Sequence, residues 1–168
     1  MRKINILKAI VDFIWIIAVP IAAPATVIIL ILINFDGFSD LNFQFVGIEL
    51  KLNSIFSKLL LTLLGISFLL QIYSLHIFRK VLRYFKQVKI FDDFVISSFN
   101  KIGKLLIISG TSIIVISFVG RIYLENQIII SVGFHPYLIV IVLGLFFQIL
   151  SEIFKIAKNQ KQENDLTI

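Results

Sequence analysis

Five polar residues interrupt otherwise apolar stretches of the sequence, and they are the first candidates for chemistry. They are Asp12, Gln71, His76, Lys104 and Glu152. If these stretches cross a membrane, ionisable groups within them are expensive and tend to pair. One interpretation is simple interfacial pairing, of Lys8 with Asp12 and of Glu152 with Lys155. The other is a polar cluster in the inner leaflet, with His76 as a pH-sensitive member.

The sequence lacks the motifs that usually mark catalysis or metal binding. It has no Walker A loop, no G-x-S-x-G and no H-E-x-x-H. The acidic pair Asp92-Asp93 is explained by helix capping, and His76 and His135 are predicted on opposite sides of the bilayer. Cys is absent, which excludes disulfides and thiolate chemistry. We therefore expect no enzymatic activity and no cofactor.

The amino-acid composition indicates that the segments carrying these residues lie in a membrane. Of the 168 residues, 58% are hydrophobic and 15% are charged. A soluble domain has roughly a quarter of its residues charged. A chain this poor in polar surface cannot cover a water-facing globule, and its length allows a single domain.

Four stretches are long enough to cross a bilayer, which requires about 20 apolar helical residues. They are residues 9–33, 55–78, 102–124 and 137–156, followed by a tail at 157–168. Each must be a helix in lipid, because a helix satisfies its own backbone hydrogen bonds. The sequence predicts one all-α membrane domain, a four-helix bundle.

The placement of basic residues predicts the orientation of these helices. Thirteen of the 16 Lys and Arg residues precede the first span, lie between the second and third, or follow the start of the fourth. Basic residues collect on the cytoplasmic side. Both termini are therefore predicted to be cytoplasmic, with the protein in the cytoplasmic (inner) membrane.

Residues 1–25 also resemble a cleavable signal peptide, with Ala23-Pro24-Ala25 as the possible cleavage site. The apolar run continues to Ile33, however, and the Pro inside the cleavage-site triplet disfavours cleavage. We expect the segment to remain as the first span.

Two prolines distinguish the first span. Pro20 and Pro24 remove the donors that would meet the carbonyls of Ile16 and Pro20, so this helix should bend. The bend is either a packing feature, or a functional one: a hinge, or a gap that admits a ligand.

The loop after the first span predicts an extracytoplasmic β-hairpin at about residues 41–52. Its two flanks alternate with period two around Val46-Gly47. This register pairs Phe45 with Ile48, Phe43 with Leu50 and Gln44 with Glu49. One face becomes apolar and is expected to lie on the ends of the helices.

The loop between the second and third spans is basic and is predicted to extend both helices beyond the membrane. Asp92 is placed as an N-cap, so the third helix should start near Asp93. Attraction to anionic lipid, about 1 kcal/mol per basic residue, is one explanation of the charge. The other is a partner-binding site that includes Arg79, Arg83 and Lys86.

The C-terminal tail raises the same question. The fourth helix should pass the membrane and end near Gln162, because Asn164-Asp165 favours a cap or turn. Leu166 and Ile168 then follow as two isolated apolar residues. They are candidate anchors that dock either on the protein's own basic inner loop or on a cytosolic regulator, and the alternative is a disordered end.

With the four spans, two short motifs make the chain resemble a bacterial membrane family, domain-of-unknown-function family 2975. The motifs are KIFDDFVISSFNKIG at residues 89–103 and the ending ENDLTI at residues 163–168. The resemblance implies a four-span membrane protein with no established activity. It also implies a genomic neighbour, a small cytosolic helix-turn-helix transcription regulator.

Three functions are compatible with these features. The first is a membrane-anchored regulatory or sensory partner of that regulator, with no direct contact to nucleic acid. The second is a small transporter or channel subunit, for which a homo-oligomer would be needed to build a path. The third is a membrane scaffold.

Overall fold

The computed structural model describes residues 2–33, 35, 42–45, 48–52, 54–87, 90–125 and 136–166. Its elements in chain order are α1 (Arg2–Ile17), the π-helical η1 (Ala18–Ala22), α2 (Ala23–Leu32), β1 (Asn42–Phe45), β2 (Ile48–Lys51), α3 (Ile55–Lys86), α4 (Asp93–Glu125) and α5 (Pro136–Leu166). Four helical segments in the described chain are long and apolar enough to cross a membrane: Arg2–Leu32, Ile55–Lys86, Asp93–Leu124 and Pro136–Asn164. The four spans predicted from the sequence are thus confirmed as helices.

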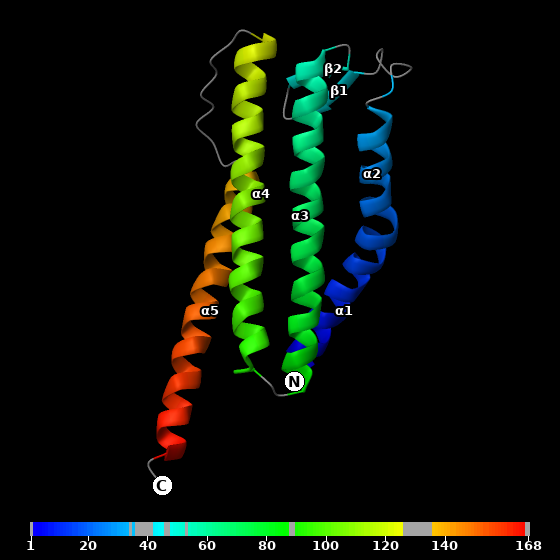
Figure 1. Ribbon diagram of the computed structural model, residues 1–168. Helices are drawn as coiled ribbons and strands as arrows, with labels where there is room; N and C mark the ends of the chain where they lie inside the picture. The colour runs from blue at the N-terminus through cyan, green and yellow to red at the C-terminus, as the bar shows by residue number, and fades with distance from the viewer. Residues whose placement is uncertain are drawn as a thin grey trace.

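The helices form an open row centred on α3 and α4 (Figure 1). The segment α1–η1–α2 packs on α3, and α5 packs on α4. The N-terminus, the C-terminus and the α3–α4 connection lie at one end of the row. The hairpin β1–β2 lies at the opposite end. We call these the terminal end and the hairpin end.

The first spanning segment bends where the prolines predict a bend (Figure 1). The π-helical turn Ala18–Ala22 contains Pro20, and Pro24 follows in the first turn of α2. A proline cannot donate to the preceding turn, so the backbone widens locally to find other partners. One turn further on, the Thr26 hydroxyl donates to the carbonyl of Ala22 at 2.7 Å.

Near the terminal end, α3, α4 and α5 share one core built largely from aromatic rings. Phe99 of α4 stacks on Phe147 and Phe154 of α5, with ring centroids 5.6 and 5.5 Å apart. Phe78 of α3 meets the Phe147 ring edge to face, and Phe85 of α3 meets the Phe154 ring in the same way. Edge-to-face and offset pairs of this kind are favourable arrangements for aromatic rings.

Glycines let α4 and α5 approach closely. A Cβ atom at Gly103 would lie 2.6 Å from the carbonyl oxygen of Gly144, and one at Gly144 would lie 2.9 Å from that of Gly103. Seven residues further along α4, a Cβ atom at Gly110 would lie 3.1 Å from the carbonyl oxygen of Tyr137. Small residues at a helix contact allow this backbone packing in membranes.

These contacts also show that α5 is displaced toward the terminal end. Tyr137, near its start, lies beside Gly110. From there α4 continues to Glu125, fifteen residues or about 22 Å. At the other end, Ser151 donates to the carbonyl of Ile96 at 2.7 Å, and Lys158 pairs with Asp93. The displacement is visible in Figure 1, where α5 begins well below the top of α4 and passes beyond the other helices.

The hairpin has the predicted register. Phe45 pairs with Ile48, Phe43 with Leu50, and Gln44 with Glu49. Leu50 is buried, in a cluster with residues of α3 and α4, while Gln44 is exposed. The side chains of Phe43 and Phe45 lie outside the described part of the chain. Leu50 therefore anchors the hairpin on the helix ends, as expected.

The start of α4 is confirmed and the end of α5 is corrected. The Asp92 carboxylate accepts a bond from the backbone N–H of Phe94 at 2.8 Å, as an N-cap does. The fourth helix, however, continues past Gln162 to Leu166. Lys, Gln and Glu in this segment are good helix formers, and extending an existing helix costs little. These two effects outweigh the preference of Asn164-Asp165 for a turn.

Candidate functional site

A chain of polar contacts joins α1 to α3 near the terminal end. The Arg79 side chain donates from Nε to Asp12 Oδ1 at 2.5 Å, and its guanidinium carbon lies 4.0 Å from the centre of the Trp15 ring. Trp15 Nε1 in turn donates to Nδ1 of His76 at 3.1 Å. Lys8 lies 4.0 Å from the second oxygen of Asp12. We call Asp12, Trp15, His76 and Arg79 the α1–α3 network.

The network explains how charges are tolerated so far into an apolar segment. Asp12 and Arg79 are each about one quarter exposed, and each charge has an opposite charge or a ring face beside it. A cation over an indole contributes about 0.5–2 kcal/mol, more when water is excluded. Because Nδ1 of His76 accepts a bond, a neutral imidazole carries its proton on Nε2. The network binds the first spanning segment to the rest of the molecule.

The five predicted polar residues do not form one cluster. Asp12 and His76 belong to the α1–α3 network, and Gln71 faces a pocket described below. Lys104 on α4 and Glu152 on α5 are exposed. In the described part of the chain, the predicted Glu152–Lys155 pair does not form, whereas the predicted Lys8–Asp12 pair does.

Sequence reasoning missed two members of the network. Trp15 was not singled out, although it is the single tryptophan of the chain and lies one turn from Asp12. Arg79 was assigned to a candidate partner-binding surface, and its contact with Asp12 was not predicted. The sequence feature that could have predicted this pair is an acidic residue and a basic residue at similar depths in two adjacent spans.

The other residues predicted to bind a partner lie at or near the terminal end. Arg83 and Lys86 are exposed on the last turns of α3. Leu166 is the last residue of α5, and its side chain, like the whole of Ile168, lies outside the described residues. The last turns of α5 project past the ends of α3 and α4 (Figure 1).

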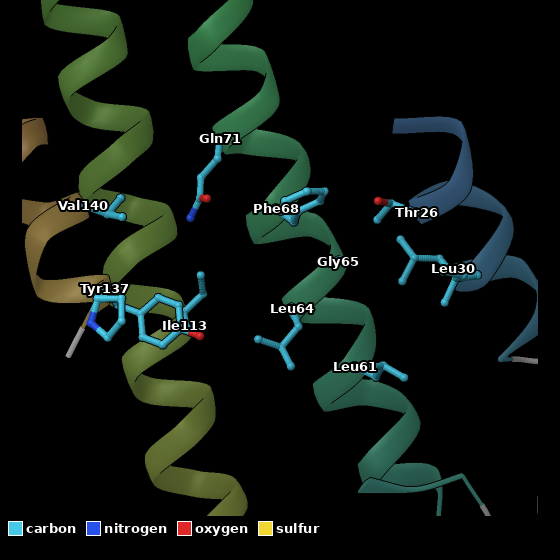
Figure 2. Close-up of a pocket in the computed structure, with 12 residues that line it drawn as sticks. Thr26, Leu30, Leu61, Leu64, Gly65, Phe68, Gln71, Ile113, Tyr137 and Val140 are labelled. Atoms are coloured by element: carbon cyan, nitrogen blue, oxygen red, sulfur yellow. The ribbon is translucent and has the colours of Figure 1, made fainter. Parts of the chain in front are cut away.

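A pocket of about 460 Å³ lies between α2 and the first turn of α5, with α3 and α4 behind it. Figure 2 shows Thr26 and Leu30 on the α2 side and Tyr137 and Val140 on the α5 side. The side chain of Gln71 points into the same space from α3. Sequence reasoning missed this pocket, because it exists only through the displacement of α5.

The described residues offer little for metal chemistry, since they contain no group of three or more His, Asp or Glu side chains that could hold an ion. These features define a multi-pass membrane protein, whose described residues include four helices able to span a membrane, the α1–α3 network and an apolar pocket.

The family model for a protein of unknown function, DUF2975, matches residues 12–168, and the chain belongs to this family. Comparison with curated proteins and with solved structures gave no match.

Proposed function

We propose that this protein is a non-enzymatic regulatory or sensory component of the bacterial cytoplasmic membrane. In this proposal both termini are cytoplasmic and the hairpin is extracytoplasmic. The terminal end holds a cytosolic partner, a small helix-turn-helix transcription regulator.

The charge distribution supports the orientation. The terminal end collects the basic residues of α1, of the second half of α3 and of α5, whereas Lys51, Lys58 and Arg121 lie toward the hairpin end. Basic residues flanking spans favour the cytoplasmic side. The structure adds that both chain ends lie at that same end of the molecule (Figure 1).

The observation that carries the functional proposal is the projection of α5. The helix has 31 residues, about 46 Å at 1.5 Å per residue, whereas the apolar core of a bilayer is about 30 Å thick. Its last turns, from Asn159 to Asn164, are polar and exposed. A structured polar extension at the terminal end, where Arg83 and Lys86 are also exposed, offers a protein partner a rigid surface at low entropic cost.

Orientation is tested first. The chain has no cysteine, so single cysteines can be placed at the exposed positions Gln44 and Lys86 without background. A membrane-impermeant maleimide added to intact cells should label the variant at 44 and leave the variant at 86 unlabelled until the membrane is opened. Labelling of position 86 in intact cells would overturn the orientation and the partner proposal with it.

The partner is tested by measuring whether the helix-turn-helix regulator encoded beside this protein co-purifies with it in mild detergent. The variant Arg83→Glu with Lys86→Glu, and a truncation after Gln162, should each reduce recovery of the regulator. The control Lys51→Glu has the same kind of charge change at an exposed position of the hairpin end and should not. Equal recovery from all four proteins would contradict a partner site at the terminal end.

A further inference from the structure

We propose that the pocket between α2 and α5 is a binding site for a long-chain neutral lipid that ends in a hydroxyl or carbonyl group. The polar end of this lipid meets the side-chain amide of Gln71, and its chain extends toward the hairpin end. This site goes beyond the partner proposal and does not depend on it.

The depth of the pocket fits such a molecule. Lys58 and Arg79 on α3 are 21 residues apart, about 31 Å, which matches the apolar core of a bilayer. Within that interval the α3 lining runs from Leu61 to Gln71, about 15 Å. The pocket therefore begins near one boundary of the core and ends just past its middle.

The lining selects an uncharged ligand. No Asp, Glu, Lys, Arg or His is among the described residues that line the pocket. A charged end group would lie there without a counter-ion, and an isolated charge in an apolar environment is strongly disfavoured. A volume of about 460 Å³ falls within the range of roughly 300–1,000 Å³ that is usual for small-molecule sites.

Gln71 supplies the reason for a polar end group. Its amide points into the pocket (Figure 2), and among the described residues it has no hydrogen-bond partner. An amide left unsatisfied near the middle of a bilayer costs several kcal/mol in the apolar limit. The nearby Thr26 hydroxyl already donates to the backbone of its own helix. A ligand hydroxyl or carbonyl would satisfy the Gln71 amide, which can both donate and accept.

The test uses the purified full chain in lipid nanodiscs and a photoreactive diazirine analogue of dodecanol. Dodecanol, dodecane and dodecanoate compete against this label, each compared at equal mole fraction in the bilayer. Labelled residues are identified by mass spectrometry. We expect labelling at Thr26, Leu64 and Phe68, with dodecanol competing roughly three- to tenfold better than dodecane, as one net hydrogen bond implies. Dodecanoate should also compete less well than dodecanol, because its charge would lie in the pocket without a counter-ion.

Two matched variants locate the hydrogen bond. Gln71→Met keeps the length of the side chain and removes the amide, and Gln148→Met makes the same change on α5, away from the pocket lining. The first should remove the advantage of dodecanol over dodecane, and the second should leave it intact. The fluorescence of Trp15, the single tryptophan of the chain, checks that both variants are folded. Labelling spread evenly over lipid-facing residues would overturn the site, and equal competition by dodecane would overturn the proposed ligand class.

Discussion

The close contact between Gly103 of α4 and Gly144 of α5 gives a stability prediction. In Gly103→Ala the new methyl group would lie 2.6 Å from the carbonyl oxygen of Gly144, where ordinary contact begins near 3.4 Å. The atom that must give way is backbone, so α4 and α5 must separate by several tenths of an ångström. Overpacking of this kind costs about 1–3 kcal/mol.

Gly65→Ala provides the matched control. Both substitutions replace a helical glycine, and alanine gains about 1 kcal/mol of helix propensity in each. At Gly65 the new methyl group would meet only the side chain of Leu30, which can change its rotamer. We therefore expect Gly103→Ala to lower the free energy of unfolding by about 1–3 kcal/mol relative to Gly65→Ala.

The double variant tests the reasoning itself. Gly144→Ala clashes with the carbonyl oxygen of Gly103 across the same gap. Once the helices have separated for one methyl group, the second finds room, so the two costs should add to well below their sum. Unfolding by denaturing detergent in mixed micelles, followed by far-ultraviolet circular dichroism, measures the native protein, the two single variants, the double variant and Gly65→Ala. Full additivity, or a Gly103→Ala protein as stable as Gly65→Ala, would show that the helices are not held this closely.

Two further substitutions test the α1–α3 network and the start of α4. Arg79→Met leaves Asp12 without its nearest cation, which should lower the free energy of unfolding by roughly 2–3 kcal/mol and change the fluorescence emission of Trp15. Adding Asp12→Asn to this variant should restore most of the stability, and no recovery would mean that the two residues do not act as a pair. Asp92→Ala should cost about 1 kcal/mol and speed amide hydrogen exchange at residues 94–96. The control Asp93→Ala breaks only an exposed pair with Lys158 and should cost less than Asp92→Ala, so equal exchange in the two variants would argue against the cap.

Local patterns in the sequence predict much of this fold. The four spans follow from apolar length, the bend from Pro20 and Pro24, and the hairpin register from period-two alternation. The start of α4 follows from the capping chemistry of Asp92. Each of these depends on residues close together in the chain, where spacing alone determines the geometry.

The features that the sequence did not predict depend on how one helix is placed against another. The pairing of Asp12 with Arg79 requires α1 and α3 to meet at one depth, and the pocket requires α5 to start beside Gly110. Hydropathy specifies that a helix crosses a membrane and leaves its axial position free. That position is determined by contacts such as Gly103 against Gly144, which no local pattern encodes.

The displacement of α5 connects the two proposals physically. It leaves room for the pocket at the first turn of the helix, and it projects the last turns beyond α3 and α4 (Figure 1). A ligand that contacts Tyr137 and Val140 therefore touches the same continuous helix that presents the proposed partner surface. A ligand shifts such an element only if it binds two positions of α5 unequally. Spin labels at positions 86 and 160 test this coupling, since their separation should change when dodecanol is added to the native protein and remain constant in Gln71→Met. An unchanged separation in the native protein, with dodecanol bound, would show that the pocket does not control the projecting end.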